Sequence, residues 1–126
     1  MQQFSVNKVR GKAINENTVN EREIKLIASV DPRAPIQRDT FGCGMTIMQP
    51  GQVHEEHAHP DSEEMILVIS GSGTARIGGK EINVHPMDVI GIDRGEAHTF
   101  TNAGEVPLRL YWVYNPPGPE KKFIVD

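Results

Sequence analysis

Short runs with the character of β-strands, separated by glycine and proline, constrain the fold of this chain more than any other feature. They recur at fairly regular intervals, and almost no segment repeats apolar residues at the helical period. A series of this kind favours an all-β sandwich or barrel. The chain has 126 residues, which suits one domain that buries a sizeable core. We expect strands at residues 24–30, 41–49, 64–70, 74–77, 80–84, 89–93, 98–102 and 108–115.

The ends of the chain have a different character from this core. Residues 1–23 are polar and weakly patterned, so we interpret them as an N-terminal arm. Residues 115–119 contain three prolines, which lack the N–H donors that a strand ladder needs. This stretch is therefore expected to cap a barrel or cross its mouth. We predict a single domain over 1–126, with its barrel core at 41–115 and a tail at 116–126.

Charge and cysteine content exclude several classes of function. The net charge is -4 without a basic patch, so no nucleic-acid partner is expected. Because no segment has the apolar length to cross a bilayer, and none near the start resembles a leader, we expect no membrane association. The single cysteine, Cys43, excludes an internal disulfide and favours a cytoplasmic location. We interpret Cys43 as a small buried residue rather than a catalytic thiol.

Four side chains that can bind a metal follow the rhythm of the predicted strands. His57 and His59 are two residues apart, which places them on the same face of an extended strand. Glu64 follows after a short turn, and His98 begins another alternating run that a closed sheet could bring to the same point. Imidazole nitrogens with one carboxylate suit Mn, Fe, Co, Ni or Zn.

The spacing of these residues resembles the first sequence motif of the cupins. That motif is a Gly, five residues, His-x-His, three or four residues, Glu, six residues and a Gly. The positions that match it throughout, with the four-residue spacer, are Gly51, His57, His59, Glu64 and Gly71.

A second cupin motif follows in the expected order. Gly95, His98 and Asn102 match it, whereas Met87 and Asp93 stand where the family has Gly and Pro. Both departures fall at turns or strand ends rather than at ligands. The resemblance implies a double-stranded β-helix, or jelly-roll, barrel. It also implies that His57, His59, Glu64 and His98 bind one divalent ion.

Neighbouring residues compete with this ligand set. Glu63 is the alternative to Glu64, but strand parity and the six-residue distance to Gly71 favour Glu64. His54 and His85 are at none of the specified positions of the two motifs and are interpreted as structural residues. Burying three imidazoles and a carboxylate without a cation would be costly. Four such ligands leave two adjacent positions of an octahedral ion for substrate, and the metal should dissociate below about pH 6.5.

The cupin pattern also implies a set of pocket walls, although alternation does not decide which face of segment 108–115 points inward. Arg109 is the one cation among these residues, and it either pairs with a substrate carboxylate or is solvated. No catalytic group is assigned beyond the metal itself. The wall residues are Met45, Met48, Ile66, Phe100, Arg109, Tyr111 and Trp112.

The resemblance implies a metal-dependent enzyme that acts on a small oxygenated molecule, either a carboxylate or keto compound or a sugar derivative. Dioxygenase, decarboxylase and isomerase types all occur among similar cupins. The His-x-His-Pro run is similar to that of germins and oxalate-metabolising cupins, which favours Mn or Fe over Ni, Zn or Co. The alternatives are an auxiliary or cyclase-like cupin of a biosynthetic pathway and a non-catalytic binding barrel. We expect a homodimer that covers the apolar face of Met65, Leu67 and Ile69.

Overall fold

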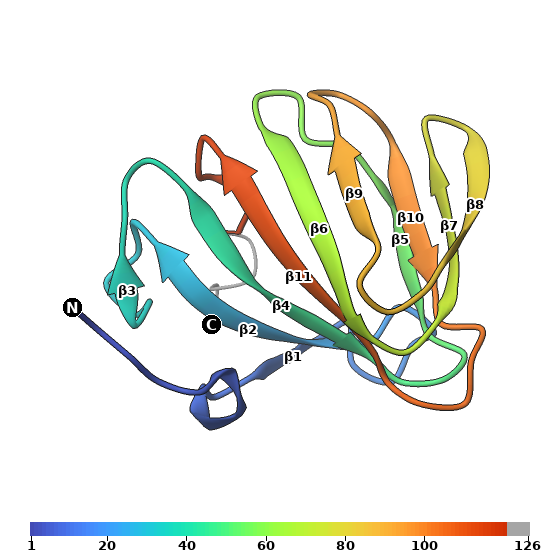
Figure 1. The fold of residues 1–126 in the computed structure, drawn as a ribbon, viewed down its shortest axis with the longest axis horizontal. Coiled ribbons are helices and arrows are strands. Elements are labelled where there is room, and N and C mark those ends of the chain that lie inside the picture. Colours follow the sequence, from blue (N-terminus) through green and yellow to red (C-terminus); the bar gives the residue numbers. More distant parts are fainter. Residues whose placement is uncertain (121–126) are drawn as a thin grey trace.

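The computed structural model describes residues 1–120, and residues 121–126 of the predicted tail lie outside the described part. Almost all of its regular structure is β (Figure 1). One short 3-10 helix, η1 (Val6–Lys8), precedes the strands. The strands are β1 (Lys12–Ile14), β2 (Arg22–Ser29), β3 (Ile36–Gln37), β4 (Gly42–Met48), β5 (Val53–His57), β6 (Glu63–Ser70), β7 (Gly73–Ile77), β8 (Lys80–Val84), β9 (Val89–Ile92), β10 (His98–Thr101) and β11 (Leu108–Asn115).

Two sheets curve around a common interior, as Figure 1 shows. The larger sheet has the order β1-β2-β4-β11-β6-β9, with β3 pairing in parallel with β2. The smaller sheet has the order β5-β10-β7-β8. Strands that are distant in sequence therefore lie side by side, which is the arrangement of a double-stranded β-helix. The predicted all-β jelly-roll fold is confirmed.

The predicted strands agree with the observed ones to within two residues at each end. β1, β3 and η1 were not expected from the sequence, because these elements are short and lie in polar stretches. His57 and His59 were expected on one strand, but β5 ends at His57 and His59 lies in the loop that follows. β1 belongs to the segment 1–23 and pairs with β2 of the same chain, with Lys12 opposite Ile24. Part of the predicted arm is thus built into the edge of the larger sheet. Within residues 1–120, no helix is long and apolar enough to span a bilayer.

Strand β11 shows which face of the larger sheet points inward. Its buried residues are Leu108, Leu110, Trp112 and Tyr114, whereas its odd-numbered residues are partly buried or, at Asn115, exposed. On β6 the inward residues are likewise buried, whereas Met65 is 49% exposed on the outer face. The outer face of β6 is therefore open in the single chain. The interior holds one hydrophobic cluster, and a second, smaller cluster around Cys43 lies on the outer face.

The proline-rich segment crosses the end of the barrel where β5 leads into β6. The hydroxyl of Ser62 donates a hydrogen bond of 2.7 Å to the carbonyl of Pro116. The buried carboxylate of Glu120 then accepts hydrogen bonds from Ser29 and from the backbone of Gly118. These contacts hold the segment against the barrel at the end where the histidines lie.

Candidate metal centre

The site begins with an irregularity in β5. This strand pairs with β10 so that His57 lies opposite His98 and His54 lies opposite Phe100. Two residues of β5 therefore face the single residue Thr99, which makes a β-bulge. In a regular strand, residues three apart would point to opposite faces. The bulge instead places His54 and His57 on the same, inward face of the sheet.

Backbone carbonyls fix the orientation of three imidazole rings. The carbonyl oxygen of Glu55 lies 3.1 Å from Nδ1 of His54 and 3.0 Å from Nδ1 of His57. The carbonyl oxygen of Glu96 lies 2.9 Å from Nδ1 of His98. Because a carbonyl oxygen only accepts, each Nδ1 must carry the hydrogen. The Nε2 atom of each neutral ring then presents its lone pair, as in a metal-binding histidine.

Three of the predicted ligands converge on one point. The ligand nitrogens of His57, His59 and His98 all lie within 4.8 Å of one another, so this group could hold a metal ion. His59 follows the end of β5, and its carbonyl accepts a hydrogen bond of 2.9 Å from the backbone of Gly95. The turn before β10 is thereby attached to the loop that carries His59. Contacts between the two motifs thus bring distant ligands together.

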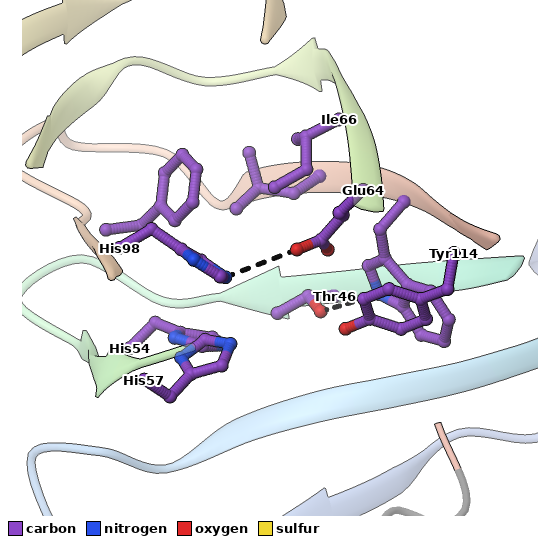
Figure 2. Close-up of a pocket in the computed structure, with 10 residues that line it drawn as sticks. Thr46, His54, His57, Glu64, Ile66, His98 and Tyr114 are labelled. Atoms are coloured by element: carbon purple, nitrogen blue, oxygen red, sulfur yellow. Dashed lines mark hydrogen bonds and ion pairs between the residues drawn. The ribbon is translucent and has the colours of Figure 1, made fainter. Parts of the chain in front are cut away.

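Glu64, at the start of β6, directs its carboxylate toward the same point (Figure 2). Its Oε1 lies 3.2 Å from Nε2 of His98 and 3.8 Å from Nε2 of His59. Neither Oε1 of Glu64 nor Nε2 of His98 has a hydrogen-bond donor among the described residues. A carboxylate oxygen facing an imidazole lone pair in a buried site is unfavourable unless a cation lies between them. The donor set therefore fits a divalent transition metal.

Two further titratable groups line the same space. Burial, followed by the charge of Arg22, lowers the pKa of His54 well below its ordinary value, so this ring is neutral. Burial, followed by the charge of Glu64, raises the pKa of Tyr114 well above its ordinary value. The nearby Glu64 carboxylate disfavours the phenolate, so the phenol of Tyr114 remains protonated. Neither residue was placed in the site by the sequence analysis.

The cavity beside the histidines is small. Its enclosed volume is about 10 Å³, which is room for roughly one water molecule, and beyond this the space opens to solvent. The indole N–H of Trp112 donates to Thr46 across the wall, over 3.0 Å. The lining residues are Thr46, His54, His57, Glu64, Ile66, His98, Phe100, Leu110, Trp112 and Tyr114. None of these described residues is a lysine or an arginine.

The wall residues named from the sequence divide into two groups. Ile66, Phe100 and Trp112 line the cavity, whereas Met48 is fully buried in the core. Met45, Arg109 and Tyr111 occupy odd positions that face away from the interior. There, Arg109 donates to the hydroxyl of Ser70, and Tyr111 contacts the sulfur of Cys43.

The residues that competed with the ligand set also have clear positions. Glu63 is exposed, whereas Glu64 is buried and faces inward. The side chain of His85 is 67% exposed and lies near Asp88 in the turn after β8. His54, which was interpreted as a structural residue, lines the cavity. No sequence signal marked His54, because the bulge that turns it inward contains two glutamates rather than glycine or proline.

A double-stranded β-helix with a histidine group at one end of its interior is the arrangement that defines cupins. The family model described as "Cupin domain" matches residues 44–114, and the chain belongs to this family. The resemblance drawn from the two motifs is confirmed.

Similar proteins include two polyketide synthase proteins of Streptomyces. The chain is 32% identical over 72 residues to the tetracenomycin polyketide synthase protein TcmJ of Streptomyces glaucescens, which covers 57% of this chain and 48% of the relative. It is 30% identical to the polyketide synthase CurC of Streptomyces cyaneus, over 61% of this chain and 50% of the relative. The chain thus spans about half the length of these curated relatives.

Solved structures show the same fold at lower identity. A predicted oxalate decarboxylase from Thermotoga maritima superposes with a TM-score of 0.78 and 20% identity, covering 91% of this chain and 99% of that one. At this level of identity the likeness establishes the fold and not the activity.

Proposed function

We propose that this chain is a metal-dependent cupin enzyme that binds one divalent transition-metal ion through His57, His59, Glu64 and His98. The observation that carries the proposal is the 3.2 Å approach of Glu64 Oε1 to Nε2 of His98, whose other nitrogen donates to a carbonyl. Two electron-rich atoms facing each other in a buried site need a cation. Mn and Fe are the first candidates for this ion, ahead of Ni, Zn and Co.

The walls of the cavity support a substrate class. A bound ion would supply a Lewis acid for oxygen atoms of a substrate. Of the described residues that line the cavity, several are aromatic and none is a cation that could pair with a substrate carboxylate. We therefore propose a small oxygenated aromatic or polyketide-type molecule, or the oxygenated end of a larger one, ahead of oxalate or a sugar acid. The names of the Streptomyces relatives are consistent with this choice.

Metal analysis tests the first part of the proposal. Protein purified without chelators should contain about one equivalent of a divalent transition metal, and His57→Ala should lose it. The matched control is His85→Ala, because His85 is an exposed histidine away from the site. Equal metal content in both variants would contradict the proposal.

Turnover experiments test the second part. Reconstituted protein is offered hydroxylated aromatics, diketones, oxalate and sugar acids with each of the candidate metals. Oxygen consumption by the Fe-loaded protein would assign a dioxygenase, and ring closure without oxygen uptake would assign a cyclase-like role. Turnover of none of these compounds with any metal would instead favour a binding barrel.

We also propose that two copies associate through the outer face of β6 and β9. Met65, Ile69 and Val89 are 49%, 38% and 63% exposed there, next to one another on paired strands. Covering these side chains would remove an apolar patch from water. Light scattering at micromolar concentration should give the mass of a dimer, and Met65→Glu should shift it toward the monomer.

A further inference from the structure

We infer that His54 is a residue that positions the substrate: its Nε2 accepts a hydrogen bond from a protonated hydroxyl of the molecule bound beside the metal. The inference rests on the proposed function, since it names the chemical group that this metal site would recognise. It concerns a fourth imidazole, at a position that the first cupin motif leaves unspecified.

The geometry leaves one nitrogen of His54 for a ligand. Nδ1 donates to the carbonyl of Glu55, which is also the acceptor for His57. The two rings lie side by side, with centroids 4.2 Å apart, and Figure 2 shows both beside the space that Glu64 and His98 face. Nε2 is on the opposite side of the ring from Nδ1. Among residues 1–120, no side chain or backbone group donates a hydrogen bond to it.

An acceptor in this position needs a donor. His54 is only 8% exposed as a whole, but its Nε2 is not fully enclosed, so this nitrogen opens onto the cavity. The donor is therefore water or a molecule bound in the cavity that His54 lines, and a bound hydroxyl that displaces the water must replace its hydrogen bond.

His54 lies beside the metal-binding group rather than within it. Its ring centroid is 6.5 Å from that of His98, whereas the ring of His57 is 4.1 Å from His98. The group of convergent ligand atoms contains His57, His59 and His98 but not His54. A molecule that occupies an open position on the ion would therefore be adjacent to His54. The imidazole can then contact the ligand while the metal site remains complete.

The rest of the cavity makes His54 selective for a donor. Thr46 Oγ already accepts from the indole of Trp112, and the hydroxyls of Thr46 and Tyr114 can donate as well as accept. Of the described lining residues outside the ligand set, His54 is thus the one whose remaining polar atom can only accept while the ring is neutral. A chelator that keeps one O–H, such as a monoanionic catechol, satisfies it. A chelator with carboxylate oxygens alone, such as oxalate, does not.

Binding measurements on two variants test this assignment. Co²⁺-loaded protein is titrated without oxygen with catechol and with oxalate, and binding is followed through the visible absorption of the metal. We expect His54→Phe, which keeps a ring but removes the acceptor, to weaken catechol binding about fivefold, the value of one ordinary hydrogen bond. Oxalate affinity and Co²⁺ affinity should stay within about twofold. His54→Gln places an amide oxygen near the position of Nε2 and should restore most of the catechol affinity.

Four other results are possible, and each contradicts a particular part of the proposal. If His54→Phe leaves the ratio of catechol to oxalate affinity unchanged, His54 does not position a hydroxyl. If His54→Phe loses as much Co²⁺ affinity as catechol affinity, His54 supports the metal ligands instead of positioning the substrate. A failure of His54→Gln to restore catechol binding would also count against acceptance at Nε2. If the unmodified protein binds no Co²⁺, the proposed function fails together with the inference, whereas the first three outcomes leave the metal site intact.

Discussion

At one end of the barrel interior the buried side chains are Met48, Val68 and Leu108, each with 0% of its surface exposed. At the other end they are His98 and Glu64, at 1% and 7% exposure. The first end lies where β4 finishes and β11 starts, and the second lies where β6 and β10 start (Figure 1). These side chains are all buried, but the two ends differ in chemistry.

The difference separates what stabilises the fold from what the site requires. Burial of the apolar end is favourable by itself, at roughly 25 cal/mol for each Å² of apolar surface. Burial of the histidines and the carboxylate is unfavourable until a cation neutralises them. The barrel should therefore fold without metal, and the polar end alone should respond when metal is added or removed.

The largest effect expected is the stabilisation of the polar end by metal. When free metal is at a thousand times its dissociation constant, binding to the folded state should raise the free energy of unfolding by about 4 kcal/mol. His98→Ala should abolish this gain, because it removes a buried ligand of the convergent group. Urea unfolding with and without metal measures it. His85→Ala should keep the full increase in the free energy of unfolding on addition of metal. If His98→Ala shows the same increase, metal does not act through the histidines of the polar end.

A substitution that creates a cavity at the apolar end should lower the stability of the fold and leave metal binding unchanged. Leu108→Ala should lower the free energy of unfolding by about 3 kcal/mol, because Leu108 is fully buried in the main cluster. The metal dissociation constant should not change. Val106→Ala is the surface control and should cost less than about 0.5 kcal/mol, since Val106 is 56% exposed. A tenfold loss of metal affinity in Leu108→Ala would show that the two ends are coupled.

The bulge that orients two imidazoles depends on an ion pair between the sheets. The buried guanidinium of Arg22 contacts both carboxylate oxygens of Glu55, at 2.9 and 3.3 Å, and Glu55 supplies the bulge carbonyl. Arg22→Met should keep the packing but release this carboxylate, which is partly exposed to water. We expect metal affinity to fall about tenfold while one equivalent still binds at saturation.

The control for this prediction is Arg33→Met, which removes an exposed arginine that pairs with Asp31 on the surface. It should leave metal affinity unchanged. Calorimetric titration of both variants separates a specific effect on the bulge from the general loss of a positive charge. If both variants lose affinity equally, the ion pair with Glu55 has no special role.

The apolar framework and the three-histidine group could be predicted from the sequence for different reasons. Strand alternation placed β11 correctly, because Leu108, Leu110, Trp112 and Tyr114 repeat with period two. The same alternation could not choose the inward face, since the odd positions also carry large apolar side chains. The pairing of β11 with β4 and β6 decides it, and this pairing depends on contacts distant in sequence.

The polar end was predictable only where the spacing of the family motifs applied. His57, His59 and His98 follow those motifs and come together. His54 does not, and strand parity places it on the face opposite to His57. The bulge reverses that parity, and its two glutamates give no sign of it in the sequence. The parity rule for regular strands therefore gives the wrong face for His54, because the β-bulge makes the strand irregular there.

The smallest effect expected concerns a turn at the apolar end, where the second motif departs from the family. Met87 stands in the place of the motif glycine and has a φ of 73°, in the left-handed region that favours glycine. Its backbone N–H donates to the carbonyl of Val68, so the turn is attached to the apolar end. The side chain is 70% exposed, and its removal loses little packing. Met87→Gly should therefore raise the free energy of unfolding by about 1 kcal/mol without changing metal affinity.

A second methionine provides the comparison that makes this measurement decisive. Met65 is also exposed but lies within the regular strand β6, where glycine costs about 0.5–1 kcal/mol. Met65→Gly should therefore lower stability in urea unfolding while Met87→Gly raises it, although both changes remove the same side chain. Opposite signs would show that backbone conformation at position 87, rather than side-chain loss, determines the result. A loss of stability in both variants would mean that the turn does not require the left-handed conformation at position 87. Met87 would then carry no backbone strain that glycine could remove.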